Sequence, residues 1–253
     1  MNKDTNFDDL AGHFKKKIYG SLKGKIRLAV LKRDLKLCLP QLEHGSLNVL
    51  DIGAGIAQMG LYLASMGHNV CINDISENML NLAKEEAKQY SDINVAWHHG
   101  PFQTLPAAKY DLVLCHAVLE WLDDPKSLVQ VLESQLADKG TVSLMFYNYD
   151  ALVMHNLVRG NFNKINSDNL SGMKGGLTPP NPLKLAWVEK YLKQEGFDLF
   201  YKSGVRVFSD YVGVKRGGNE SENAVLDMEL KYSNQEPYLQ MGRYIHLLCR
   251  RVR

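Results

Sequence analysis

The sequence of 253 residues has few of the features that mark membrane or secreted proteins. No apolar run approaches the roughly 20 residues that cross a bilayer, and the N-terminal run MNKDTNFDDLAGHFKKK has no apolar stretch suited to a signal peptide. The four cysteines, Cys38, Cys71, Cys115 and Cys249, form no C-x-x-C pair, and each stands alone in an apolar segment. We therefore expect a cytoplasmic protein with reduced thiols, no membrane association and no metal site.

The net charge of +2 conceals an uneven distribution of charge along the chain. Residues 1–50 contain 10 basic and 5 acidic side chains, residues 51–150 contain 5 and 13, and residues 151–253 contain 15 and 10. Two basic flanks permit an anionic partner such as nucleic acid. Lysines on solvated helix faces would explain the same pattern.

From Ser46 onward, short β-rich runs alternate with helical patterns, which is typical of βαβ units and a mainly parallel sheet. The predicted strands are 47–52 (LNVLDI), 69–74 (NVCIND), 93–98 (INVAWH), 110–117 (YDLVLCHA), 141–147 (TVSLMFY), 197–208 and 243–252. The predicted helices between them are 58–66, 77–90, 125–137 and 182–194. The last two strands have little between them but one helix, which indicates an antiparallel end of the sheet.

Two helical patterns, residues 8–19 and 23–38, precede the sheet, and we expect them to form a cap over one of its edges. Residues 160–182 are rich in Asn, Gly, Ser and Pro and show no periodicity, as in a lid, a binding loop or a disordered segment. We therefore predict one domain without internal repeats. Its parts are a helical cap (1–45), a core (46–150), an insertion (151–182) and the second half of the sheet (183–253).

The sharpest local feature is the run VLDIGAG, where a strand ends at Asp51 and turns through Gly53, Ala54 and Gly55 into a helix. Glycines at such a turn let the backbone approach a ligand closely. Asp74 ends the next strand, 23 residues after Asp51, where a carboxylate can accept hydrogen bonds from both hydroxyls of a ribose. Together these features indicate a crevice that binds a nucleoside.

We do not expect the ligand to be a dinucleotide. The glycine motif that binds dinucleotides requires a third small residue at the position where this chain has Gln58. Instead VLDIGAG, Asp74 and the run YDLVLCHAVLEWLDDP resemble the first, second and fourth motifs of the class I S-adenosylmethionine-dependent methyltransferases. That resemblance implies an α/β, Rossmann-like fold with a seven-stranded, mainly parallel sheet whose last strand is antiparallel. It also implies that residues 46–150 bind the cofactor and that residues 151–182 lie on the substrate side.

The resemblance assigns roles to individual residues. Asp51 and Gly55 belong to the first motif, in which Gly53 and Ala54 face the amino acid part of the cofactor, and Asp74 holds the ribose. The residues implied for the rest of the pocket are Phe102 and Gln103 beside the adenine and His116, which closes the pocket after the fourth strand.

Segments outside these motifs are similar to the bacterial tRNA 5-carboxymethoxyuridine methyltransferases. They include NFDDLAGHFKKKIYG, GKIR, CHAVLEW, LMFYN, SGVRVFSDY and QEPYLQMGRYIHLLCR, so the similarity spans nearly the whole chain. It departs at 164–180 and at Ala54, Ile56 and Ala57. That family transfers a methyl group from S-adenosylmethionine to the carboxylate of 5-carboxymethoxyuridine at the tRNA wobble position. By this resemblance Arg27 reaches the methionine carboxylate of the cofactor.

Such a substrate needs no general base, because its carboxylate is already ionised at neutral pH and can attack a sulfonium methyl group directly. Arginine or tyrosine donors would align it, and the candidates are Arg206 first, then Arg243, Tyr244 and Tyr19. His155 lies either at the rim of this site or in a structural hydrogen bond.

The implied partner is the anticodon stem-loop of tRNA, and no protein partner is predicted. Recognition of a single-stranded loop combines phosphate contacts with bases stacked on aromatic rings. The basic residues placed for it are Lys15, Lys16, Lys17, Lys23 and Lys25, together with the C-terminal arginines Arg250, Arg251 and Arg253.

Three alternatives remain open at this stage. A small-molecule O- or C-methyltransferase would share every cofactor motif, and a noncatalytic RNA-binding protein could hold the cofactor as a structural ligand. The third alternative is a carboxylated S-adenosylmethionine as the cofactor, which requires an additional arginine near the transferred group; Arg206 fits either role.

Overall fold

The computed structural model describes residues 20–167, 170, 178–213 and 217–252. The predicted helix over 8–19, and with it Tyr19 and the lysines Lys15, Lys16 and Lys17, lies outside the described residues, as does Arg253.

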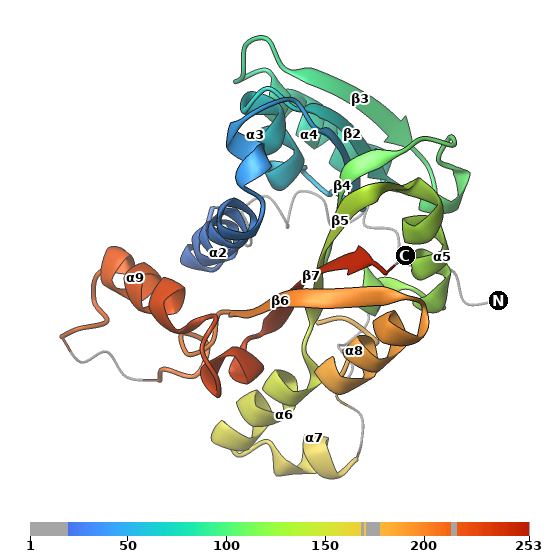
Figure 1. Cartoon of the computed structure of the whole chain (residues 1–253). Helices are drawn as coiled ribbons and strands as arrows, with labels where there is room; N and C mark the ends of the chain where they lie inside the picture. The colour runs from blue at the N-terminus through green and yellow to red at the C-terminus, as the bar shows by residue number, and fades with distance from the viewer. Residues whose placement is uncertain (1–19, 168–169, 171–177, 214–216, 253) are drawn as a thin grey trace.

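A seven-stranded sheet forms the centre of the molecule (Figure 1). The strands are β1 (Asn48–Ile52), β2 (Asn69–Asp74), β3 (Asn94–His99), β4 (Tyr110–His116), β5 (Leu136–Tyr147), β6 (Phe197–Val205) and β7 (Tyr244–Arg251). Their order across the sheet is β3-β2-β1-β4-β5-β7-β6. β1 to β5 pair in parallel, whereas β7 runs antiparallel to both β5 and β6. The predicted sheet with an antiparallel last strand is thus confirmed.

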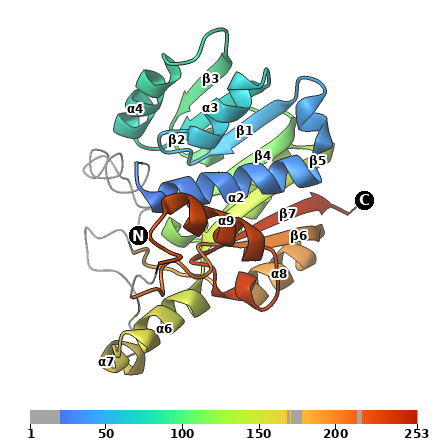
Figure 2. The same cartoon turned by 90° about the vertical axis from the view of Figure 1, so that its left-hand side faces the viewer.

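Helices cover both faces of the sheet. They are α2 (Leu22–Cys38), α3 (Gln58–Ser65), α4 (Glu77–Ala87), α5 (Lys126–Gln135), α6 (Tyr149–Val158), α7 (Phe162–Asn166), α8 (Leu185–Gln194) and α9 (Glu222–Tyr232). Short 3-10 helices span Pro40–Glu43, Phe102–Thr104, Leu119–Trp121 and Tyr238–Met241. Helices α2, α3, α4 and α9 pack on one face, which is turned toward the viewer in Figure 2, and α5 and α8 pack on the other.

The central strand β4 shows why the sheet needs helices on both sides. Leu112 and Leu114 belong to the core under α2 and α3, while Val113 and Cys115 belong to the core under α5 and α8. All four side chains are fully buried. Because successive side chains of a strand point to opposite faces, a continuous apolar run such as this one is buried on both.

Helix α2 lies across the middle of the sheet and not over one edge, so the expected place of this part of the cap is corrected. Its Ile26 and Val30 share a core with Leu114 of β4 and Met145 of β5. Polar contacts also fix the position of α2. Asp34 of α2 is fully buried and accepts hydrogen bonds from the strands beneath, including one from His246 of β7. A helix that carries such a carboxylate must lie where its partners are.

Three local predictions are also corrected. The aperiodic stretch 160–182 contains the short helix α7, and its residues 168–169 and 171–177 lie outside the described residues. Strand β5 begins at Leu136, five residues before the predicted start, because Leu136 pairs with Tyr110 of β4. Strand β6 ends at Val205, because Arg206 adopts a φ of +61° that no strand accommodates.

Within the part of the chain that the structure describes, no helix is long and apolar enough to cross a bilayer.

Candidate active site

The described residues form two cavities near the carboxyl ends of the parallel strands. We call the first, of about 80 Å³, the crevice. It is lined by Gly53, Asn73, Asp74, Ile75, Gly100, Pro101, Phe102, Gln103, Ala117, Val118, Trp121 and Leu122. The carboxyl ends of β1, β2, β3 and β4 therefore meet at one place, which is where open α/β sheets bind their ligands.

The glycine turn after β1 needs its glycines. Gly53 and Gly55 both have a φ of +59°, a conformation that side chains disfavour. A Cβ atom on Gly53 would lie 2.5 Å from Cγ2 of Val118, so even alanine would clash. The backbone N–H of Ala54 donates to the carbonyl of Asn73 at 2.9 Å and holds the turn against β2. A ligand in the crevice can thus approach bare backbone.

Asp74 stands at the end of β2 and is 7% exposed. Its Oδ2 accepts the N–H of Gly55 at 2.7 Å, and its Oδ1 accepts the N–H of Ser76 at 2.8 Å. Asp74 therefore holds the glycine turn, and it also lines the crevice. These features, with the apolar wall of Phe102 and Trp121, fit an adenosyl group.

Replacing Asp74 by alanine is expected to weaken the binding of S-adenosylmethionine at least about tenfold, because the variant loses an acceptor for the ligand and the bonds that hold Gly55 and Ser76. Isothermal calorimetry measures the affinity. Asp138→Ala, which removes an exposed acid at the opposite end of β5, serves as the control. An unchanged affinity of the Asp74 variant would remove this residue from the binding site.

Sequence reasoning overlooked Asn73 of the crevice. The side chain of Asn73 is 2% exposed, and its Nδ2 donates to the carbonyls of Gly100 (2.8 Å) and His98 (3.2 Å). It therefore ties the end of β3 to β2 and shapes the wall beside Phe102. The available signal was a polar residue at the penultimate position of an apolar strand, next to Asp74.

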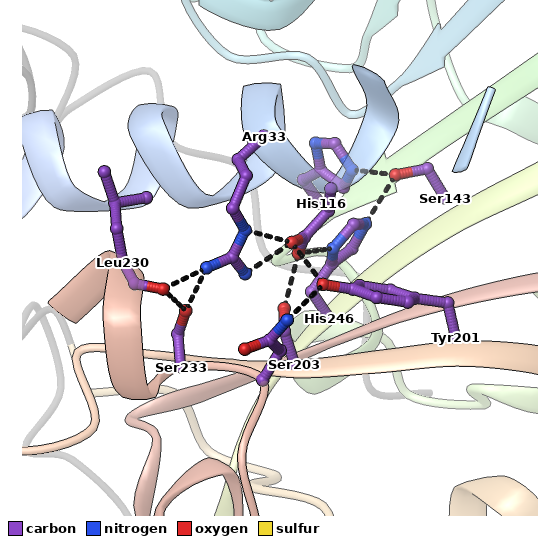
Figure 3. A network of polar contacts seen from close by, with 10 residues as sticks. Arg33, His116, Ser143, Tyr201, Ser203, Leu230, Ser233 and His246 are labelled. Carbon is purple, nitrogen blue, oxygen red and sulfur yellow. Dashed lines mark hydrogen bonds and ion pairs between the residues drawn. The ribbon is translucent and has the colours of Figure 1, made fainter. Parts of the chain in front are cut away.

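Asp51 and His116 line neither cavity. Oδ2 of Asp51 accepts the N–H of Gly60 at 3.1 Å, and burial raises the pKa of Asp51 to about 7. Nε2 of His116 lies 2.8 Å from Oγ of Ser143 (Figure 3), and burial lowers the pKa of His116 well below its ordinary value, so the ring is neutral. The role of His116 in closing the pocket stays a prediction; its position in β4 turns the ring toward the face under α2.

The second cavity, of about 630 Å³, is lined by five cationic side chains and one acidic side chain among the described residues, and we call it the basic cavity. Its lining comprises Ser21, Leu22, Lys23, Ile26, Arg27, Tyr147, His155, Arg159, Thr178, Arg206, Ser209, Asp210, Arg243 and Tyr244. Because the cations outnumber the lone carboxylate, the cavity favours an anionic ligand.

Two arginines of the basic cavity are held by one acid. Nε of Arg243 lies 2.8 Å from Oδ2 of Asp210, and Nη2 of Arg206 lies 3.3 Å from the same oxygen. Burial opposes ionisation of Asp210, but the two arginines outweigh it and lower its pKa. Nη1 of Arg243 also donates to the hydroxyl of Tyr147 at 3.0 Å, and the guanidinium of Arg206 lies 5.5 Å from the ring centre of Tyr244. The acid thus orients both guanidinium groups in advance.

The predicted substrate residues Arg206, Arg243 and Tyr244 therefore meet in one cavity, together with Arg27 of α2. Lys23 lines the same cavity, with Nζ 3.7 Å from Oδ1 of Asp210. Lys25 lies outside it, and its exposed ammonium pairs with Glu222 of α9.

The basic cavity also contains residues to which the sequence assigned no role: Arg159, Ser209 and Asp210. Ser209 and Asp210 fall in SGVRVFSDY, so position within a recognised segment was the available signal. His155 lines the cavity, where burial and the charge of Arg243 lower its pKa to about 4.

Glu120 is a buried acid in the 3-10 helix beside the crevice, and it is 1% exposed. Burial raises its pKa to about 8, although nearby backbone N–H groups and Arg27 favour the ionised form. A folded-state pKa above the ordinary value means that the folded protein binds the proton more tightly than the unfolded chain. Stability therefore falls as the pH rises from the ordinary pKa of the acid toward 8.

Glu120→Gln is accordingly expected to raise the free energy of unfolding at pH 8 more than at pH 6, because glutamine has no charge to bury. For one proton the difference between variant and wild type can grow by at most about 1.4 kcal/mol per pH unit. Urea unfolding of both proteins across this pH range measures it. A difference that is independent of pH would show that Glu120 is ionised throughout.

The described residues include no group of three or more His, Cys, Asp or Glu side chains arranged to hold a metal ion. The model of the methyltransferase domain family matches residues 50–144, which contain the crevice.

The chain is 41% identical over 253 residues to the tRNA 5-carboxymethoxyuridine methyltransferase of Escherichia coli (strain K12), and the match covers 98% of this chain and 97% of that protein. A ubiquinone biosynthesis O-methyltransferase of Acinetobacter baylyi is 30% identical over only 97 residues, 37% of this chain and 41% of that one. Among solved structures, the magnesium protoporphyrin IX methyltransferase of Synechocystis with bound SAH has a TM-score of 0.66 at 16% identity, covering 97% of this chain and 96% of that chain, which shows the shared fold. The full-length match establishes that this chain belongs to the family of the tRNA 5-carboxymethoxyuridine methyltransferases.

Proposed function

We propose that this protein transfers the methyl group of S-adenosylmethionine to the carboxylate of 5-carboxymethoxyuridine at the wobble position of tRNA, giving 5-methoxycarbonylmethoxyuridine. The observation that carries the proposal is the basic cavity, in which Arg206 and Arg243 converge on one acid. A pair of arginines aligned in advance suits a carboxylate substrate. The name of the full-length relative supports the same substrate.

When bound, S-adenosylmethionine supplies a methyl group on a positively charged sulfur. We assign its ribose to Asp74, its adenine to the wall of Phe102 and Gln103, and its amino acid part to Gly53 and Ala54. Arg27 would reach the methionine carboxylate from α2. Asp51 and Gly55 support the site from behind, through the start of α3 and through Asp74.

Arg206, Arg243 and Tyr244 would hold the substrate carboxylate, with Tyr19 as a further candidate. Burial raises the pKa of Tyr244 to about 12, so its hydroxyl remains a donor at neutral pH. No general base is required, because the carboxylate is already ionised. The contribution of these residues is alignment of the oxygen, the methyl carbon and the sulfur, an effect that supplies several kcal/mol of barrier reduction.

The anticodon stem-loop would approach over the basic cavity. Lys23 and Arg159 line its wall, and we assign phosphate contacts to them. We assign the same role to Lys15, Lys16, Lys17 and Lys25. A reaction on tRNA agrees with the expected cytoplasmic location and requires no protein partner. The shared sheet and its cores support our proposal of one domain.

The direct test is to incubate the protein with S-adenosylmethionine and tRNA from bacteria that lack the corresponding enzyme. The tRNA is then digested under conditions that preserve esters, and the nucleosides are weighed by mass spectrometry. We expect 5-carboxymethoxyuridine to gain 14 mass units as its methyl ester, about the mass of one CH₂ group. The control is tRNA with an unmodified wobble uridine, which should gain nothing. Cofactor binding without conversion would contradict the proposal and favour a small-molecule acceptor or a carboxylated cofactor.

A further inference from the structure

The turn after β6 carries three residues of the basic cavity: Arg206, Ser209 and Asp210. Arg206 has a φ of +61°, a backbone conformation that a side chain other than glycine adopts only at a cost in free energy. Such a conformation persists only where surrounding contacts impose it. The contacts that impose it here come from a distant segment, helix α9.

Glu229 of α9 is the residue that makes these contacts. Its side chain is fully buried. Oε2 accepts the N–H of Val207 at 2.8 Å, and Oε1 accepts the N–H groups of Phe208 at 3.3 Å and Ser209 at 2.9 Å. Three successive N–H groups that immediately follow Arg206 thus end on one carboxylate.

Hydrogen bonds fix the C-terminal end of helix α9 beside the turn. Nη1 of Arg33, on α2, donates to the carbonyl of Leu230 at 2.5 Å and lies 2.6 Å from Oγ of Ser233, as Figure 3 shows. The N–H of Gly204 donates to the carbonyl of Ser233 at 2.6 Å. The helix that carries Glu229 is therefore connected both to α2 and to the strand that leads into the turn.

Two polar side-chain atoms of the turn are also buried. Nε of Arg206 and Oγ of Ser209 are both buried, and neither has a hydrogen-bond partner among the residues that the structure describes. Both residues belong to the wall of the basic cavity. Unpaired buried donors are costly, so their presence on one turn of a binding cavity indicates a function for that turn.

We propose that Glu229 is a positioning residue for substrate recognition: its carboxylate fixes the turn that presents Arg206 and Ser209 to the substrate carboxylate. This inference rests on the function proposed above. Glu229 does not line the basic cavity and acts only through the backbone of residues 207–209.

Glu229→Gln is the variant that tests the proposal. Glutamine has nearly the same size but only one acceptor oxygen, and its NH₂ group would face an N–H donor of the turn. We expect kcat/KM for tRNA to fall about 10- to 100-fold, since small misplacements of aligning groups have effects of this size. The affinity for S-adenosylmethionine should stay within about twofold, because no contact of Glu229 reaches the crevice. Asp227→Asn, an exposed acid on the same helix, is the matched control and should match wild type.

A double-mutant cycle separates positioning from a general loss of structure. If Glu229 acts through Arg206, then Glu229→Gln should reduce kcat/KM by less than about twofold in a protein that already carries Arg206→Ala. Losses that multiply in full would overturn the proposal. So would a Glu229→Gln protein with the activity of the Asp227→Asn control. If Glu229→Gln does not fold, Glu229→Asp, which keeps the charge but shortens the reach, replaces it in the same cycle. Wild-type protein that fails to convert tRNA would instead refute the function proposed above.

Discussion

Replacing Asp34 by alanine is expected to lower the free energy of unfolding by about 3–5 kcal/mol, the range found when one member of a buried ion pair is removed. Asp34 is fully buried in α2. Its Oδ1 accepts the hydroxyl of Tyr201 at 2.8 Å and Nε of Arg33 at 2.9 Å. Its Oδ2 accepts Oγ of Ser203 at 2.5 Å and lies 2.8 Å from Nδ1 of His246. The variant leaves the donors of Arg33, Tyr201, Ser203 and His246 without their acceptor, and two of these residues, Ser203 and His246, are fully buried.

The network continues beyond Asp34 and explains why its loss is expected to be large. Nε2 of His246 lies 2.8 Å from Oγ of Ser143, which in turn lies 2.8 Å from Nε2 of His116 (Figure 3). These contacts connect α2 to β4, β5, β6 and β7 through one chain of polar groups. Because such networks are costly when only partly satisfied, removing the single carboxylate affects every member.

The effect of Asp34→Ala should depend on pH. Burial opposes ionisation, but His246, Arg33 and Ser203 outweigh it and hold the pKa of Asp34 below its ordinary value. A lowered folded-state pKa contributes stability above the pKa of the unfolded chain, about 3.9, and this contribution is lost as the pH falls through the folded value. The difference between wild type and variant is therefore expected to be full at pH 7 and to shrink below about pH 4.

Urea unfolding followed by circular dichroism measures both effects. Asp227→Asn, which changes an exposed acid, is the control and should lie within about 0.5 kcal/mol of wild type. A loss of less than about 1 kcal/mol for Asp34→Ala at pH 7 would show that the network contributes little to stability.

Arg206→Ala is expected to reduce kcat/KM for tRNA about 100-fold, the effect of losing a hydrogen bond between two charged groups. The affinity for S-adenosylmethionine should remain unchanged, since Arg206 lines the basic cavity and not the crevice. Arg206→Lys keeps the charge but loses the planar pair of donors, so an intermediate loss is expected.

The methyl-ester assay and calorimetry together measure these two quantities. Lys88→Ala removes an exposed cation from the C-terminal end of α4 and controls for a change in overall charge. Near-normal turnover of the Arg206 variant would contradict its proposed role and leave Arg243 and Tyr244 as the residues that hold the carboxylate.

Local sequence patterns were sufficient to predict where the glycine turn and the acid of the crevice lie. The turn at Gly53 and the acid at Asp74 lie where strands end, and the parallel order of the strands brings both to one edge of the sheet. The positions of Gly53 and Asp74 depend on strand periodicity and on the conformational freedom of glycine, which neighbouring residues along the chain determine. Phe102 and Gln103, which follow β3, were assigned from the family resemblance.

The basic cavity could be identified only from the tertiary structure. Arg27, Tyr147, Arg206 and Arg243 come from α2, β5, the turn after β6 and the segment before β7, and their convergence follows from which helix covers which strand. The same holds for the partner of His116: the place of His116 at the end of β4 was predictable, but Ser143, which its ring contacts, comes from β5.

The sequence by itself thus determined the sheet, the glycine turn and the kinds of residue available for an anionic substrate. Only the tertiary structure decided that α2 crosses the middle of the sheet, that Asp210 joins two arginines and that Glu229 holds the turn after β6. The physical reason is the distance along the sequence over which the interactions act. Strand and turn formation depend on sterics and hydrogen bonds over a few residues, whereas a buried carboxylate selects its partners from segments that only packing brings together.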